Sequence, residues 1–545
     1  MTPTADRFIT TNTSSGQDEN MLHRLETVAG WTAAVLAAAV LLSGCGTETN
    51  ERPAEAGTAD TTGDLPADIP DTVRIGVGAS TTSIDPNRAV QEVDVMALDL
   101  IAGTLLVQRG GEAAPGLATG CEADPTQLKY TCTLRDGLKF SDGSPLTSSD
   151  VKATFDRALN DPANANAGII SSLESVAAPT RTQVIFTLNA PTASFPLALT
   201  EAPVGVFPAA AAADPNFWQH PVSAGPYALV ANTPNEVTFK RNENYPDELQ
   251  PVVPNVEFKV IVDTNTRLLQ LNTGQIDVAN QLSAPLAKQV KSPAKAYATP
   301  QYGGVYLYLN NRSQPLDDPK VRQAISAAID RNQINGIAYL GQNHVLGSYL
   351  PSAMEGHDPT VPTDRDVDKA RELLRGSACE DGCELTIMVR SGFAPYDAIA
   401  TIVQQNLDEV GIKVAVQTVD QATADTNEQN GNFQMEVGNL FDIVNAPELV
   451  MLPYGLTPGG GIDSLFSGYD SPAMTDLVEQ LSSTDDPKAR ADLFAKINAL
   501  FATDLPFIPL VDQANIWASS LSPRIVAYTP GGVYRVGTEQ SGPGQ

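Results

Sequence analysis

Hydrophobic residues along the chain follow two periodicities that alternate with each other. Apolar or alternating runs of strand length lie at 73–77, 183–188, 256–262, 305–310 and 412–416. Such runs predict strands that are buried on one or both faces. Between the runs, apolar residues recur every three or four positions, as from Val321 to Ile329 after Pro319, and this spacing predicts amphipathic helices. Helices that alternate with strands favour α/β lobes.

The segment from Leu134 to Leu159, LRDGLKFSDGSPLTSSDVKATFDRAL, shows this change of period most clearly. Its two Asp-Gly pairs predict turns, because Gly accepts a positive φ and Asp can bond its own backbone. Leu138 and Phe140 between the turns predict a short strand. Thr147 and the two serines after it offer N-caps, and the apolar residues that follow occupy one helix face.

Length and charge limit the classes of protein that the chain can belong to. A chain of 545 residues with 42% hydrophobic residues predicts two or three lobes with sizeable cores. The formal net charge of −30 excludes a nucleic-acid-binding protein, which needs clustered Lys and Arg. A solvated, soluble surface explains the acidity, and attraction of cationic ligands is the alternative.

The N-terminus carries a targeting signal instead of part of the fold. Residues 1–20 are polar, which makes Met21 an alternative start, and an apolar run from Trp31 to Leu42 suits a signal peptide. Leu42-Ser43-Gly44-Cys45 closes the run and resembles a bacterial lipobox, which implies that Cys45 carries lipid. The alternative is a signal peptide that merely contains a cysteine. Residues 46–70 predict a disordered tether.

Four cysteines remain after Cys45, and a secreted protein can join them as disulfides. Three connectivities are open, of which the local one pairs Cys121 with Cys132 across a predicted hairpin and Cys379 with Cys383 around a small loop. A zinc site is the rival interpretation, but the spacings do not suit one and the four histidines are scattered. We therefore expect no metal.

Catalytic motifs are missing from the sequence. It contains no G-x-S-x-G, no H-E-x-x-H, no P-loop and no G-x-G-x-x-G after a strand. We expect no enzyme activity and no cofactor.

Several strings together carry a family resemblance. The segment 134–159, Ser223-Ala224-Gly225-Pro226-Tyr227 and the run from Val321 to Arg331 resemble signatures of the extracytoplasmic solute-binding proteins of ABC importers. The chain is similar to their peptide/nickel-binding family, family 5, which includes oligopeptide- and dipeptide-binding proteins. The likeness extends over about 73–520.

The resemblance implies a fold and a division into lobes. The fold is α/β and periplasmic-binding-protein-like, of type II and the three-lobed cluster C, with two ligand-clamping lobes and an inserted extra lobe. The implied ranges are 71–110, 221–300 and 512–538 for lobe I, 111–220 for lobe II, 301–511 for lobe III, and 539–545 for a disordered tail.

Candidate ligand-binding residues also follow from the resemblance. In peptide-binding members, a carboxylate of lobe III meets the ligand's α-ammonium group, and Asp442 within Gly438-Asn439-Leu440-Phe441-Asp442-Ile443 matches it. Asn439 and Ile443 depart from the Trp and the aromatic residue that are usual there, which weakens the peptide assignment. The other candidates for contact with the ligand are Phe441, Asn439, Ser80, Thr81, Thr82 and Tyr302.

The implied function is capture of a small solute between lobes I and III and its delivery to a membrane permease, with ATP hydrolysis left to partner subunits. Oligo- or dipeptides are the leading ligands, and a nickel chelate, haem, a sugar or an opine is the alternative. We expect a monomer on the outer face of a bacterial cytoplasmic membrane, held by lipid. A lipoprotein that serves as a sensor or scaffold without transport is the rival hypothesis.

Overall fold

The computed structural model describes residue 59 and residues 65–109, 111–209, 214, 216–392, 394–458 and 467–537. The predicted signal segment 1–45 with Cys45, most of the tether 46–70, and the tail 539–545 lie outside the described residues.

A ten-stranded mixed sheet runs through most of the described chain, in the order β14-β13-β15-β12-β16-β11-β1-β10-β9-β8. Its strands are β1 (Thr72–Val77), β8 (Tyr227–Thr233), β9 (Glu236–Arg241), β10 (Asn255–Val260), β11 (Val278–Ala279), β12 (Lys295–Leu309), β13 (Cys383–Arg390), β14 (Ile412–Val419), β15 (Met435–Phe441) and β16 (Phe507–Ser519). Val73 and Ile75 of β1 are fully buried, and β1 pairs in parallel with β10 and β11. This is the α/β sheet that the periodicity predicts.

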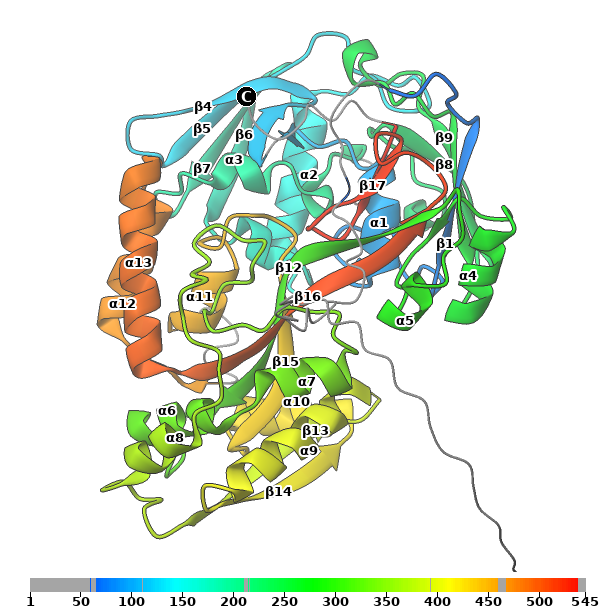
Figure 1. The fold of residues 1–545 in the computed structure, drawn as a ribbon. Helices are drawn as coiled ribbons and strands as arrows, with labels where there is room; N and C mark the ends of the chain where they lie inside the picture. The colour runs from blue at the N-terminus through cyan, green and yellow to red at the C-terminus, as the bar shows by residue number, and fades with distance from the viewer. Residues whose placement is uncertain are drawn as a thin grey trace, which may run out of the picture. The chain divides into compact units, whose positions relative to one another are not determined.

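Two long antiparallel strands, β12 and β16, connect the two halves of this sheet. Figure 1 shows them side by side, between the half that holds β1, β8 and β9 and the half that holds β13, β14 and β15. The lobe boundaries expected at 300/301 and 511/512 fall inside these strands. Both strands are buried along most of their length. β12 begins ten residues before the run at 305–310, and β16 has no corresponding run in the sequence.

Helices pack on this sheet or on one another. They are α1 (Glu92–Ile101), α4 (Thr264–Asn272), α5 (Ala284–Ala287), α6 (Pro319–Ala328), α7 (Arg331–Ala338), α8 (Val367–Leu374), α9 (Ala394–Asp408), α10 (Gln421–Asn430), α11 (Met451–Leu456), α12 (Pro472–Ser482) and α13 (Pro487–Asp504). Asp263 and Asp318 cap α4 and α6 by accepting backbone N–H bonds, as Asp does at an N-cap.

A separate antiparallel sheet, β4-β5-β7-β6, lies between α1 and β8 in the chain. Its elements are β4 (Ala118–Ala123), β5 (Lys129–Leu134), α2 (Ser148–Asn160), β6 (Leu173–Thr180), β7 (Gln183–Leu188) and α3 (Phe195–Ala198). A capping box between Thr147 and Asp150 begins α2, and Val151 and Phe155 are fully buried against the sheet.

Short elements complete the described chain. They are β2 (Leu106–Arg109), β3 (Glu112–Pro115), β17 (Val526–Tyr528), β18 (Tyr534–Val536), and the 3₁₀ helices η1 (Ala167–Ile170), η2 (Ala202–Val204), η4 (Phe217–Gln219) and η5 (Asp247–Leu249). The prediction of a strand through Leu138 and Phe140 is wrong, because no strand of that length forms there. Only Lys139 forms a bridge, to Pro145, because the second Asp-Gly turn reverses the chain at once.

Three large hydrophobic clusters form the interior. One draws on residues 302–511, one on the strands around β1, and one on the β4–β7 sheet and α2. The third cluster also contains Val444, Ala446 and Leu449, which follow β15. The segment after β15 therefore packs into the core beneath the separate sheet.

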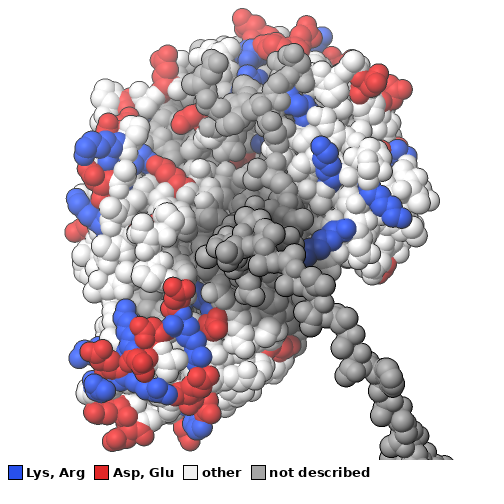
Figure 2. Space-filling model, in the orientation of Figure 1, with Lys and Arg blue, Asp and Glu red and all other residues white. Residues whose placement is uncertain are grey.

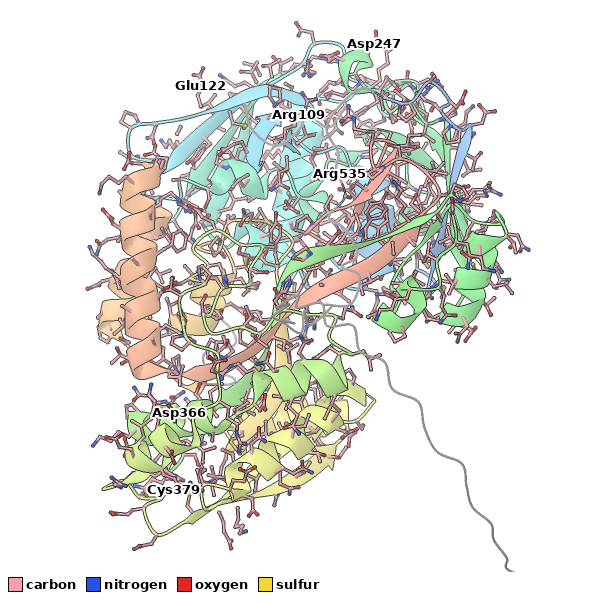
Figure 3. All side chains as sticks on the ribbon, in the orientation of Figure 1. Arg109, Glu122, Asp247, Asp366, Cys379 and Arg535 are labelled. Carbon is pink, nitrogen blue, oxygen red and sulfur yellow. A yellow bond between two sulfur atoms is a disulfide. The ribbon has the colours of Figure 1, made fainter. Side chains whose placement is uncertain are left out.

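Both local disulfides are present. Cys121 pairs with Cys132 across the β4–β5 register, and Cys379 pairs with Cys383 between α8 and β13, in the lower part of Figure 3. On the face that Figure 2 shows, basic side chains are interleaved with acidic ones over the part that holds α6 and α8. This face therefore carries no continuous basic surface over those helices.

Candidate ligand-binding site

Asp442 follows β15 directly and is placed by that strand's pairing with β12. Gly303 of β12 lies opposite Phe441, and the Asp442 N–H donates to the Tyr302 carbonyl oxygen at 2.7 Å. The Asp442 side chain is buried, and its Oδ1 accepts from the N–H groups of Ile443 and Val444 at 2.8 and 3.2 Å. Its Oδ2 is also buried and accepts no well-formed hydrogen bond from the described residues, although the backbone N–H of Met451 lies close enough to the carboxyl group to favour its charged form.

Burial raises the pKa of Asp442 to about 7. The backbone N–H groups of Val444 and Ile443 favour the carboxylate and oppose this rise, whereas the negative charge of Glu448 adds to it. The group is thus balanced between its neutral and charged forms near neutral pH, and a nearby cation would favour the charged form.

Two more carboxyl groups lie near Asp442. Burial, helped by the charges of Asp99 and Asp442, raises the pKa of Glu201 to about 8, against a hydrogen bond from Thr200 and the charge of Arg535. Burial also raises the pKa of Asp99, again against Arg535. The guanidinium group of Arg535 thus acts on two of these carboxyl groups, Glu201 and Asp99.

Arg535 of β18 is that guanidinium group. Its Nη1 lies 3.6 Å from Asp99 Oδ1, and its side chain is 28% exposed. Figure 3 shows Arg535 on the C-terminal part of the chain, below Arg109 of β2.

Two adjoining cavities border these groups. The larger has a volume of about 690 Å³ and is lined by Tyr302, Asp99, Tyr245 and Arg535, among others. The smaller, of about 20 Å³, is lined by Glu201, Ile443, Asp99 and Arg535. Tyr302 and Tyr245 keep their hydroxyl protons at neutral pH, because burial raises the pKa of each to about 12.

The candidate residues from the sequence divide into two groups. Tyr302 lines the larger cavity, whereas Asp442 and Phe441 line neither; the Asp442 N–H bonds to the Tyr302 carbonyl oxygen, and Ile443 next to it lines the smaller cavity. Asn439 is exposed and its Oδ1 accepts from the Tyr396 hydroxyl group at 2.7 Å. Asn439 is thus turned toward α9.

The loop after β1 does not line either cavity with its described residues, Ser80, Thr81 and Thr82. Thr82 donates from N and Oγ1 to the Asp94 carboxylate, both at 2.6 Å, and Thr81 Oγ1 donates to Asn232 Oδ1 at 2.7 Å. Hydrogen bonds within this part of the fold satisfy the two threonines, and a role in binding stays a prediction for all three residues.

Sequence reasoning missed Glu201, Asp99 and Arg535. Glu201 lies in an Ala- and Pro-rich stretch, and Arg535 lies close to the predicted tail. The described residues contain no group of three or more His, Cys, Asp or Glu side chains that could hold a metal ion. No described helix is both long and apolar enough to span a membrane.

Comparison with known families gives one match that covers more than half of the chain. The family "Bacterial extracellular solute-binding proteins, family 5 Middle" matches residues 112–461.

Individual proteins agree with that match. The glutathione-binding protein GsiB of Escherichia coli O1:K1 / APEC is 27% identical over 466 residues, which are 82% of this chain and 90% of GsiB. The solved structure of DppA from Helicobacter pylori, in complex with the peptide STSA, superposes with a TM-score of 0.70 at 22% identity and covers 86% of this chain and 98% of its own. AgaA of A. tumefaciens R10, in complex with agropinic acid, gives 0.70 at 22%, with 85% and 98% covered.

Proposed function

Because the chain belongs to family 5 of the bacterial extracellular solute-binding proteins, we propose that it captures short peptides by their α-ammonium group and delivers them to a permease. Membership makes the protein the solute-binding component of an ABC transporter. The peptide ligand and its mode of binding are the proposal.

The observation that carries the proposal is the buried Asp442 carboxyl group. One of its oxygens accepts no well-formed hydrogen bond from the described residues, with only the backbone N–H of Met451 beside the carboxyl group, and Glu201 adds a second carboxyl group nearby. Burying an ionised carboxylate costs free energy unless a cation or several donors compensate it. An ammonium group has three N–H donors and a positive charge, and it would supply both.

Anchoring and partners complete the proposal. A lipid on Cys45 would hold the protein at the outer face of the cytoplasmic membrane, since each buried lipid CH₂ contributes about 0.8 kcal/mol. The protein would act as a monomer beside permease and ATPase subunits and would itself catalyse nothing.

A non-peptide solute is the second candidate ligand. Asn439 and Ile443 stand where aromatic residues are usual in peptide-binding members, and AgaA, of the same fold, was solved with agropinic acid. A small zwitterion other than a peptide would satisfy Asp442 in the same way.

Native mass spectrometry of the chain from Thr47 onward, purified without refolding, tests the proposal. We expect a ladder of adduct masses that fit short peptides, because a closed site retains what it captured. A single non-peptide mass would replace the peptide ligand by the second candidate. A spectrum without adducts, together with no thermal shift on addition of peptides, would contradict peptide capture.

A further inference from the structure

Another cavity, of about 370 Å³, shares no lining residue with the two cavities beside Arg535. Its lining comes from α1, α4, α5, β12, β16 and the segments after β11 and α7. Gln301 of β12 lines this cavity, and the next residue, Tyr302, lines the larger of the other two. The polar lining is mostly amide side chains, and we call it the amide-lined cavity.

The amide groups of this cavity are held by their N–H ends. Three glutamines donate through Nε2 to partners within the fold: Gln281 to Glu92 Oε2, Gln301 to the Tyr528 hydroxyl oxygen at 3.1 Å, and Gln342 to the Ala514 carbonyl oxygen at 2.9 Å. A carboxylate and a backbone carbonyl group only accept hydrogen bonds, so these partners fix which end of the amide faces them. The amide oxygens of the three glutamines accept no hydrogen bond from the described residues.

Asn515 of β16 is oriented in the same way. Its Nδ2 donates to Asn280 Oδ1 at 2.8 Å, and Asn280 Nδ2 donates to Glu92 Oε1 at 3.1 Å. The Tyr528 hydroxyl group lies beside the Asn515 amide, but its single proton goes to Glu92 Oε1 at 2.6 Å.

This network leaves Asn515 Oδ1 buried without a donor among the described residues, in a residue that is only 5% exposed. A buried acceptor that lacks a donor destabilises the folded chain. A hydrogen-bond donor that enters the amide-lined cavity would therefore bind there favourably.

The charge beside the cavity is negative. Glu92 is the one ionisable residue of the lining, and burial raises its pKa, against hydrogen bonds from Tyr528 and two amides and the charge of Arg267. Arg267 is buried, does not line the cavity, and donates to the Ile261 carbonyl oxygen and the Thr264 hydroxyl group. Amide oxygens beside a carboxyl group favour a cation with several N–H donors.

We propose that the amide-lined cavity binds an alkylammonium or guanidinium group, which a lysine or arginine side chain of the captured peptide would supply. This inference rests on the proposed capture of peptides and adds a preference for basic ones. Asn515 Oδ1 and the amide oxygens of Gln301 and Gln342 would accept the N–H groups, and Glu92 would supply the opposite charge. A free organic cation has the same chemistry, and the experiment distinguishes the two sources.

Calorimetry with lysine peptides and their norleucine counterparts tests the preference, because norleucine lacks only the side-chain ammonium group. Of Ala-Lys-Ala and Ala-Ala-Lys, at least one should bind about 10-fold or more tightly than its counterpart, the value of a hydrogen bond to a charged group. In Asn515→Leu and in Gln301→Met, this ratio should fall to about 3-fold or less. Both substitutions keep the approximate size of the side chain, and Asn280 Oδ1 keeps the Tyr534 hydroxyl group as a donor at 2.9 Å in Asn515→Leu.

Gln289→Met is the matched control. Gln289 is exposed, does not line the cavity, and donates through Nε2 to the Pro285 carbonyl oxygen at 3.3 Å. Its ratio should stay within about twofold of the unaltered chain. Gln301→Met keeps the test valid if Asn515→Leu does not fold.

The outcomes separate this inference from the proposed function. Norleucine peptides that bind as tightly as lysine peptides, or a preference that both variants keep, would overturn the cation subsite and leave peptide capture standing. Agmatine is the probe for a free cation: if it binds the unaltered chain but not Asn515→Leu, while no peptide binds, the cavity takes a free cation and peptide capture fails. No binding of agmatine or of any peptide would overturn both.

Discussion

At the scale of single residues, Asp442 should contribute to ligand affinity far more than to stability. Asp442→Asn removes the charge but keeps an oxygen for the N–H groups of Ile443 and Val444. Peptide affinity should fall about 10- to 100-fold, the value of a hydrogen bond to a charged group, with an unchanged or higher melting temperature. Asp368→Asn is the control, since its side chain is 98% exposed. Calorimetry that finds equal affinity in both variants would exclude Asp442 from the site.

Asp442 and Glu201 together make ligand capture dependent on pH. Their pKa values, raised to about 7 and about 8 by burial, leave both groups partly protonated at neutral pH. An ammonium ligand favours their charged forms, so binding should release protons, and affinity should rise from about pH 6 to about pH 8. Above about pH 8 the ligand's own α-ammonium group loses its proton, and affinity should fall again. Calorimetry in two buffers of different ionisation enthalpy measures the protons released.

The same two groups make the stability of the unliganded protein fall as pH rises, whereas ligand affinity increases. Between about pH 4.5 and about pH 8 the folded state holds protons that the unfolded state has lost, so stability should fall as pH rises. The double variant Asp442→Asn, Glu201→Gln should show a flatter curve of melting temperature against pH. Identical slopes in the two proteins would mean that the groups are ionised throughout this range.

A buried cluster around Arg390 offers a test of stability alone. Arg390 Nε lies 3.0 Å from Glu436 Oε1, and the arginine also pairs with Glu428 and Asp425. Arg390→Met leaves the fully buried Glu436 without its cation and should destabilise the protein by about 3–5 kcal/mol. Because burial raises the pKa of Glu436, the loss should be smaller at pH 5, where Glu436 is protonated, than at pH 8.

Denaturant unfolding at the two pH values measures this loss. Lys413→Met is the control, because Lys413 and its partner Asp408 are both exposed, and it should change stability by less than about 0.5 kcal/mol. Similar losses in both variants would show that the Arg390 cluster is no more important than a surface ion pair.

Residues of the site differ in how visible they are in the sequence. Asp442 stands inside a recognisable string. Glu201 lies about 240 residues before it and Arg535 about 90 residues after it. Hydrophobic periodicity reports only on neighbours within one helix or strand, so it cannot indicate that such distant residues lie close together. Their proximity depends on the docking of separate sheets, which local sequence does not encode.

At the scale of elements, local signals predict most helices and strands well. The strand predicted at 183–188 is β7 itself, and the helix expected after Thr147 is α2. Both depend on neighbours within a few residues. Predictions from the sequence fail where tertiary contacts determine the structure. β12 and β16 extend through buried positions whose residues alternate little. Conversely, residues 138–140 alternate but form no extended strand, and only Lys139 makes a bridge.

The cap of α2 gives a prediction at this scale. Thr147 N donates to Asp150 Oδ2 at 2.9 Å, and the threonine side chain completes the capping box. Thr147→Ala should destabilise the protein by about 1 kcal/mol. Ser149→Ala, two residues further on and exposed, should change stability by less than about 0.5 kcal/mol. Urea unfolding measures both changes. If the unfolding curves of the two variants coincide, Thr147 does not stabilise the helix as a cap.

At the scale of the whole molecule, the segment after β15 joins parts that are distant in the chain. Ile443 lines the smaller cavity, and Val444, Ala446 and Leu449 pack into the core beneath the β4–β7 sheet. On the other side, the turn between β17 and β18 meets the same segment: a Cβ on Gly531 would lie 2.4 Å from the Ile443 carbonyl oxygen. The site is complete only while this contact is made.

Gly531→Ala should therefore separate binding from folding. Gly531 has no positive φ, so alanine is compatible with its backbone, but the added methyl group cannot lie that close to a carbonyl oxygen. The turn and the segment must move apart, and peptide affinity should fall at least about tenfold, with a melting temperature of the unliganded protein that changes little. Gly168→Ala is the matched control, because a Cβ there meets no atom within 4 Å. Equal affinity of both variants in calorimetry would show that ligand capture does not need the contact between the β17–β18 turn and the segment after β15. A fall in affinity confined to Gly531→Ala would make this contact part of closure around the ligand.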